Sequence, residues 1–147
     1  QRLAYSVLGD TVNTASRLES LSPAYFVDLV LSEQTAADCP DFALLELDQV
    51  KVKGKALPIR LFTCLGFETY AARPEYQALR ERHDRMLAAY RAQDWEAAEA
   101  ARLECLEVAP QRLQPFYGLY EKRIAEFRSD PPGADWDGVY VAKSKTG

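Results

Sequence analysis

Residues 5–21, YSVLGDTVNTASRLESL, contain the pattern on which the fold prediction rests. The β-prone run Leu3–Leu8 ends in a glycine, and residues 10–21 then have the spacing of a helix. Asn13 and Arg17 are four residues apart, so this helix would place them on one face. The stretch therefore predicts a strand, a glycine turn and a helix that presents an amide and a guanidinium together.

Such a pair suits a polyphosphate ligand or a transition state in which negative charge develops. Arginine offers a planar fork of N–H donors that matches phosphate oxygens, and asparagine can hold a sugar oxygen or orient a nucleophile. The preceding Gly9 lets the backbone approach a ligand or another chain closely. Spacing alone favours a simpler interpretation, a solvated helix face, because charged helix faces usually contact only water.

Four further segments follow before the character of the chain changes near residue 67. FVDLVL at 26–31 predicts a compact apolar strand, and residues 32–37 predict a short helix capped by Ser32. Residues 42–53 and 57–65 are strand-like, the first with polar alternation, and a glycine between them predicts a turn. These two strands are expected to form an antiparallel hairpin.

A second basic element, VKVKGK at 50–55, lies where the first of these strands ends. Alternation along a strand places Lys51, Lys53 and Lys55 on one side of it. Three ammonium groups on one edge can hold a triphosphate, whereas lysines on an edge strand also protect it against aggregation. Taken alone, the segment favours the second interpretation.

From Pro74 onward the pattern is helical. Three helices are predicted: the first has its apolar face from Tyr76 to Tyr90, the second is capped by Asp94, and the third ends at 130–132. His83 falls on the apolar face and is expected to be a packed or interfacial histidine. A turn followed by a short strand-like run is expected after these helices.

The aromatic side chains of the predicted helices are expected to form a core, which is the usual fate of an aromatic stripe. The alternative is a peptide-binding groove. These side chains are Tyr90, Trp95, Phe116, Tyr117, Tyr120 and Phe127.

Composition narrows the class of protein. The chain has 147 residues and a net charge of −4, which argues against a general nucleic-acid binder because phosphate backbones attract basic surfaces. No apolar run approaches the roughly 20 residues that span a bilayer, so no membrane insertion is expected. Cys39, Cys64 and Cys105 are widely spaced, which favours a reduced, cytoplasmic setting over a disulfide or zinc site. The first residue is Gln, so residue 1 is expected to be internal to a longer parent.

Two stretches together resemble the class III nucleotide cyclases. YSVLGDTVNTASRLES closely resembles their signature, G-D-x-V-N-x-A-x-R-L/M-E, and VKVKGKALPIRLFTCLG at 50–66 resembles the closing hairpin of the same catalytic domain. The resemblance covers about residues 1–66, the C-terminal half of such a domain. The signature is matched by Gly9, Asp10, Val12, Asn13, Ala15, Arg17, Leu18 and Glu19.

The resemblance implies an intramolecular phosphoryl transfer, in which the ribose 3′-hydroxyl attacks the α-phosphate and pyrophosphate leaves. It assigns ribose orientation to Asn13, stabilisation of charge on the α-phosphate to Arg17, and triphosphate binding to Lys53, with Lys55 a weaker candidate. The base-reading position falls at Ser6, where guanylate cyclases usually have Cys, so Ser6 favours ATP over GTP. A guanylate cyclase stays an alternative.

The resemblance also implies groups that this chain lacks. Mg²⁺ or Mn²⁺ would be held by two aspartates from the first half of the domain, upstream of this chain. Asp10 is interpreted as a turn and cap residue, and Asp38, Asp41, Glu46 and Asp48 have no convincing metal-ligand spacing. Cyclase sites of this family form at a head-to-tail homodimer interface, so the chain alone is expected to be inactive.

The predicted fold class is α+β, in three parts. Residues 1–68 would be the C-terminal half of a ferredoxin-like cyclase domain, residues 69–132 a three-helix extension, and residues 133–147 a short tail. The extension is weakly tetratricopeptide-like, and its helices are expected to form a small bundle or to dock on the cyclase half. The predicted function is part of an adenylate cyclase in intracellular signalling, on the cytoplasmic side if the parent is membrane-anchored. The alternative is a degenerate cyclase that serves dimerisation or binds a regulator through the extension.

Overall fold

The computed structural model describes residues 18–51 and 56–141. Three antiparallel strands form a sheet in the order β1-β3-β2, with β1 at Leu31–Ser32, β2 at Ala43–Val50 and β3 at Ile59–Gly66. The predicted hairpin is confirmed, since β2 and β3 pair from Ala43↔Gly66 to Val50↔Ile59. Together with the helices described next, the sheet confirms the α+β class.

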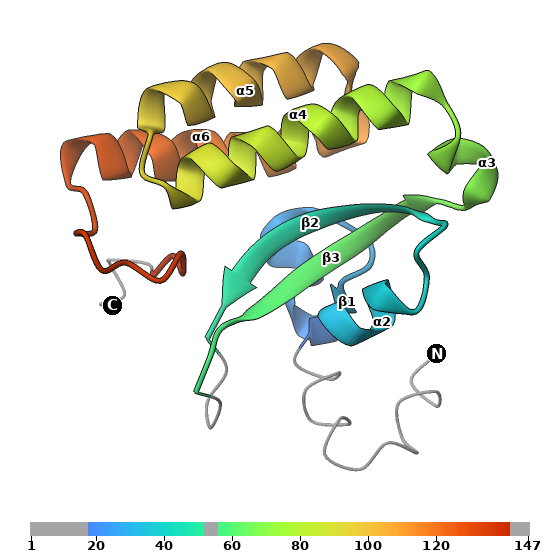
Figure 1. Cartoon of the computed structure of the whole chain (residues 1–147), viewed down its shortest axis with the longest axis horizontal. Helices are drawn as coiled ribbons and strands as arrows, with labels where there is room; N and C mark the ends of the chain where they lie inside the picture. The colour runs from blue at the N-terminus through green and yellow to red at the C-terminus, as the bar shows by residue number, and fades with distance from the viewer. Residues whose placement is uncertain (1–17, 52–55, 142–147) are drawn as a thin grey trace.

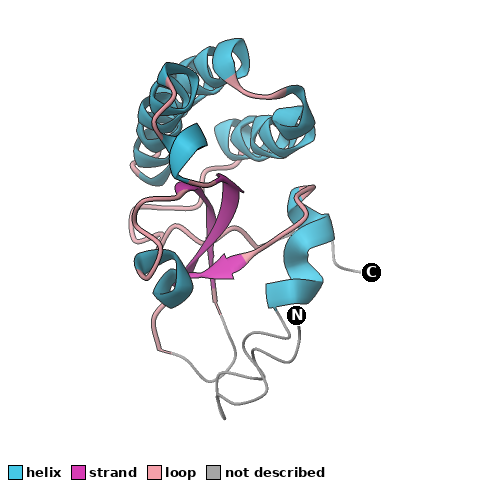
Figure 2. Cartoon of the chain, turned by 90° about the vertical axis from the view of Figure 1, so that its right-hand side faces the viewer, coloured by secondary structure: helices cyan, strands magenta, loops and turns pink. Residues whose placement is uncertain are grey.

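The helices surround this sheet. Residues 18–21 are helical and lead into a 3₁₀ turn. Figure 1 shows α4, α5 and α6 as a layer on one side of the sheet, and Figure 2 shows the same layer edge-on. We call these three helices the helical layer. The bounds are η2 Ser22–Tyr25, α2 Glu33–Ala37, α3 Glu68–Ala71, α4 Pro74–Arg91, α5 Trp95–Val108, η3 Gln111–Leu113 and α6 Gln114–Ser129.

Several helix ends form as the sequence predicts. The Ser32 hydroxyl accepts from the backbone N–H of Thr35, and the Asp94 carboxylate accepts from the N–H of Ala97, each at the start of its helix. Pro74 begins α4, at a position where its missing N–H costs nothing. These local signals fix the helix starts without help from distant residues.

Two predicted strands are wrong. In the run 26–31 only Leu31 pairs with β3, because Phe26 has a left-handed backbone (φ 60°) and its N–H closes η2 by donating to the Pro23 carbonyl. Residues 135–141 form no strand either. Their carbonyl oxygens accept from side chains instead: the Val139 carbonyl from Trp136 Nε1 at 2.8 Å, and the Asp137 carbonyl from Gln49 Nε2 at 3.2 Å.

Strand β2 is buried along most of its length, so the predicted polar alternation is absent. All of residues 43–48 are buried, including Glu46 and Asp48. Leu47 has no partner in the β3 register, which shifts between Glu46 and Asp48 as in a β-bulge. A strand covered by packed elements on both faces loses the alternation of a half-solvated one.

The helical layer closes the free edge of β2. Because β3 lies in the middle of the sheet, one side of β2 has no neighbouring strand among the described residues. Side chains of α4 and α6 donate to its carbonyl oxygens, each at 2.6 Å: Tyr76 to Leu44, His83 to Glu46, and Tyr120 to Leu47. Helix side chains thus satisfy acceptors that would otherwise be open to another chain.

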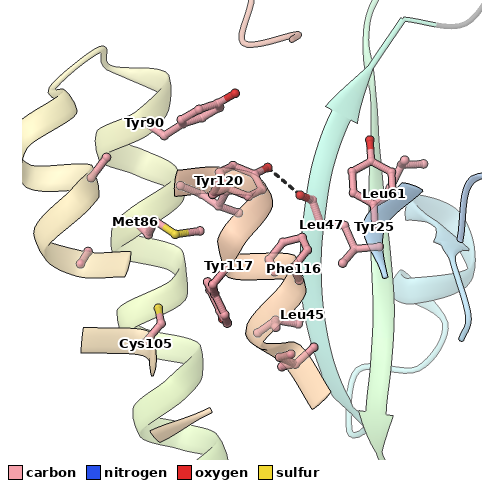
Figure 3. Packing of buried hydrophobic residues seen from close by; sticks show 14 of the residues in the cluster. Tyr25, Leu45, Leu47, Leu61, Met86, Tyr90, Cys105, Phe116, Tyr117 and Tyr120 are labelled. Atoms are coloured by element: carbon pink, nitrogen blue, oxygen red, sulfur yellow. Dashed lines mark hydrogen bonds between the residues drawn. The ribbon is translucent and has the colours of Figure 1, made fainter. Parts of the chain in front are cut away.

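The two parts of the chain share one hydrophobic core. Figure 3 shows α6 packed against β2, with Phe116 and Tyr120 facing Leu45 and Leu47. Tyr90, Phe116, Tyr117 and Tyr120 are fully buried. The aromatic stripe is therefore core, as predicted, and the helices dock on the sheet.

His83 is buried as a neutral side chain. The Glu46 carbonyl can only accept, so Nε2 carries the hydrogen, and Nδ1 accepts from the Tyr117 hydroxyl at 2.7 Å. Burial lowers the pKa of His83 from 6.5 to about 4, against a smaller upward effect of the Glu46 carbonyl. The prediction of a packed histidine is confirmed.

We expect this histidine to make folding pH-dependent. Between pH 6.5 and 4 the unfolded chain protonates His83 and the folded chain does not, so stability falls as the pH is lowered through this window. A difference of that size corresponds to about 3 kcal/mol between pH 7 and pH 4. Urea unfolding at several pH values, compared between wild type and His83→Gln, measures it, since Gln retains an N–H donor but does not titrate. Parallel stability curves for the two proteins would contradict the prediction.

Candidate functional site

The predicted site residues lie outside the described parts of the chain. Ser6, Asn13 and Arg17 precede residue 18, and Lys53 and Lys55 fall between residues 51 and 56. Their assigned roles stay predictions. The structure does describe the elements next to them in sequence. These are residues 18–25 after the first segment, and β2 and β3 on either side of the second.

The first segment continues into η2. Leu18, which directly follows Arg17 in sequence, is buried in the core. The helical residues end at 21, the predicted end of this helix, and η2 follows from Ser22 and closes with the buried Tyr25. The chain after Arg17 is therefore anchored in the core at two points, Leu18 and Tyr25.

The second segment continues from β2 and returns into β3. Val50 pairs with Ile59, and Lys51 Nζ donates to the Ala56 carbonyl at 3.5 Å across the connection. Lys53 and Lys55 belong to this connection by sequence. The end of β2 and the start of β3, which flank this connection, thus lie side by side at one end of the sheet.

The buried carboxylate of Asp48, in β2, joins this strand and η2 to the helical layer. Asp48 Oδ2 accepts from the Tyr25 hydroxyl at 2.6 Å and from Arg123 Nη2 at 2.8 Å. The Tyr120 hydroxyl lies 3.4 Å from Oδ1. Burial, and then the charge of Asp48, raise the pKa of Tyr25, so this phenol stays a donor. We call Tyr25, Asp48, Tyr120 and Arg123 the Asp48 network.

Arg123 is held on several sides. Its guanidinium lies over the rings of Tyr120 and Tyr140, at 5.0 and 4.4 Å from their centroids, and its Nη1 is 3.4 Å from the Tyr90 hydroxyl. Only 6% of Arg123 and 1% of Asp48 are exposed to solvent. The ion pair is therefore desolvated, and its geometry is fixed by packing.

Sequence reasoning missed this network, although a signal for it exists. Arg123 lies three residues after Tyr120 and four before Phe127, so it occupies the apolar stripe of its helix. Asp48 follows the run ALLEL inside a strand. A charged residue at an apolar position of each element indicates a buried partner.

A second charged cluster surrounds Glu46. Arg60 makes two hydrogen bonds to its carboxylate, at 3.0 and 3.1 Å, and Arg91 Nη2 lies 2.9 Å from Oε2. Burial raises the pKa of Glu46, but the two guanidinium groups outweigh it and hold the pKa below its usual value. The pocket beside them, about 200 Å³, is also lined by Arg80 and Asp84. Acidic partners compensate its arginines, so it is not a strongly basic site.

The described residues offer no cluster of three or more His, Cys, Asp or Glu side chains that could hold a metal ion. Within the same residues, no helix combines the length and apolar character that crossing a bilayer requires.

Comparison with known families gives these elements a common assignment. Residues 1–71 match the family model of the adenylate and guanylate cyclase catalytic domain. This segment is similar to the class III cyclases. We call residues 1–71 the cyclase segment. It contains all five predicted site residues and the three strands that the structure describes.

Two relatives match the cyclase segment. Adenylate cyclase 1 of Rhizobium meliloti is 34% identical over 67 residues, which are 45% of this chain and 10% of the relative. Adenylate cyclase of Anabaena cylindrica is 38% identical over 65 residues, 42% of this chain and 13% of the relative. The chain thus spans about a tenth of the length of these relatives. No solved structure matches.

The end of the cyclase segment divides the Asp48 network. Tyr25 and Asp48 lie inside the segment, whereas Tyr120 and Arg123 lie about 50 residues beyond its end. The same division separates the β2 carbonyls from Tyr76, His83 and Tyr120, which bind them. The helical layer is therefore joined to the cyclase segment by buried polar contacts as well as by apolar packing.

Proposed function

We propose that this chain is part of an adenylate cyclase that converts ATP into cyclic AMP and pyrophosphate. The proposal rests on one observation: Asn13, Arg17 and Lys53 occupy the family's motif positions in a segment that matches the cyclase family model. The names of both relatives, adenylate cyclases, support ATP as the substrate. Ser6 at the base-reading position supports it as well.

In this proposal the residues act by positioning and by charge stabilisation. Asn13 orients the ribose so that its 3′-hydroxyl faces the α-phosphorus. The new O–P bond forms as the bond to pyrophosphate breaks, and the hydroxyl proton is released. Arg17 stabilises the negative charge that develops on the α-phosphate, while Lys53 and Lys55 bind the triphosphate.

The proposal includes partners from outside this chain. Mg²⁺ or Mn²⁺ would bind residues that the family places before the cyclase segment, and would supply further charge stabilisation. A second copy of the protein would complete each site in a head-to-tail homodimer. We place this part of the protein in the cytoplasm.

The test is cyclic nucleotide production by the full-length protein, with ATP and GTP supplied separately and either Mg²⁺ or Mn²⁺ present. We expect cyclic AMP from ATP and much less cyclic GMP from GTP. Preferential production of cyclic GMP would reassign the protein as a guanylate cyclase. A folded protein that makes neither product would support the alternative, a module for dimerisation or for binding a regulator.

A further inference from the structure

The Asp48 network connects η2 and β2, which adjoin the two segments of the proposed cyclase site in sequence, to a helix outside the cyclase segment. We propose that Arg123 is a positioning residue of this site, acting through Asp48 and Tyr25. The inference rests on the proposed function. It assigns to the helical layer a part in catalysis without contact with the nucleotide.

Tyr25 and Asp48 lie close in the chain to the predicted site residues. Tyr25 ends η2 and follows Arg17 by eight residues, through backbone that is helical from residue 18. Asp48 lies in the last part of β2 and precedes Lys53 by five residues. The Asp48 carboxylate thus joins η2, which follows Arg17 in sequence, to β2, which precedes Lys53.

Arg123 determines where Asp48 Oδ2 lies. Tyr25 donates one hydrogen bond to Asp48 Oδ2, and Arg123 donates a second one that also joins two opposite charges. The guanidinium is itself held between the Tyr120 and Tyr140 rings. A donor fixed in this way holds Asp48, and with Asp48 the relative position of η2 and β2.

Stability alone does not account for the buried Asp48–Arg123 pair. Two desolvated charges usually contribute little net stability compared with apolar side chains of similar volume. What the pair adds is a defined distance between three elements, and phosphoryl transfer depends strongly on such distances. A misplacement of about 1 Å by a remote change can cost about 10²-fold in rate.

The chain offers a matched control for this argument. Arg102 is also a buried arginine, but its partners Glu99 and Glu121 lie in α5 and α6 of the helical layer. Its Nη2 is 2.6 Å from Glu99 and 3.7 Å from Glu121. Replacing it removes a buried guanidinium from the helical layer and leaves the Asp48 network intact.

The experiment compares the full-length wild type with Arg123→Met, Arg123→Lys and Arg102→Met, at a temperature where circular dichroism shows all four folded. We expect Arg123→Met to lower kcat with ATP by roughly 10- to 100-fold, with a smaller change in KM. Arg102→Met should keep the kcat of the wild type. Arg123→Lys should recover part of the activity, because an ammonium can still pair with Asp48 but lacks the planar fork.

Hydrogen–deuterium exchange gives a second readout that does not need activity. In Arg123→Met, peptides from residues 18–32 and 43–51 should exchange faster than in wild type, and in Arg102→Met they should not. Unchanged exchange in Arg123→Met, or an equal fall of kcat in both methionine variants, would overturn the inference. If the wild type makes no cyclic nucleotide, the proposed function fails and the catalytic role of Arg123 fails with it. Exchange then decides separately whether Arg123 holds the two elements.

Discussion

Replacing Arg17 with alanine is expected to lower cyclic AMP production by the full-length protein by about 10²–10³-fold. The proposed role of the guanidinium is to stabilise charge that appears on the α-phosphate only as the reaction proceeds. An interaction of this kind lowers the barrier more than it tightens substrate binding, so the loss should appear in kcat. Initial rates at saturating ATP measure it directly.

Two further variants make this experiment specific. Arg17→Lys retains the positive charge but loses the planar fork, so we expect an intermediate rate. Arg128→Ala removes an exposed arginine at the end of α6 and should keep full activity. The assignment of Arg17 would be wrong if a folded Arg17→Ala protein turned over ATP at the rate of wild type.

Asp48→Asn is expected to destabilise this chain by about 3–5 kcal/mol. The change removes the negative charge but little volume, so it leaves the Arg123 cation buried beside a neutral amide. Breaking one partner of a desolvated pair is costly because the remaining charge has lost its compensation. Equilibrium urea unfolding of wild type and variant, followed by circular dichroism, gives the difference in free energy of unfolding.

The double variant Asp48→Asn/Arg123→Met separates the pair from its surroundings. Removing both charges should restore a large part of the lost stability, since no uncompensated charge is then buried. Simple addition of the two single effects would contradict the coupling. A single-variant loss below about 1 kcal/mol, typical of exposed ion pairs, would show that Asp48 is solvated in solution.

The sequence predicted those parts of the fold that local signals determine. The caps at Ser32 and Asp94 depend on neighbours a few positions away, and the strands β2 and β3 pair with a segment close to them in the chain. The run 26–31 was wrongly predicted as a strand because a short apolar segment fits a strand and a packed loop equally well. What decided the outcome was the left-handed turn at Phe26.

The candidate site was predicted only in part. Asn13, Arg17 and Lys53 come from a motif, and their roles stay predictions because they lie outside the described residues. The Asp48–Arg123 pair joins residues 75 positions apart, so no local pattern could pair them. The sequence could show only that each charge lies among apolar neighbours, not that the two meet.

The closure of the β2 edge has a consequence for how this protein can be divided and how it can diverge. A catalytic unit cut at residue 71 would carry an apolar strand with open carbonyls, prone to pair with another copy. Yet Tyr76, His83 and Tyr120 recognise backbone oxygens, which every amino acid provides. These three contacts therefore tolerate changes of the side chains at Leu44, Glu46 and Leu47 themselves, whereas loss of a donor would leave a buried carbonyl without its partner.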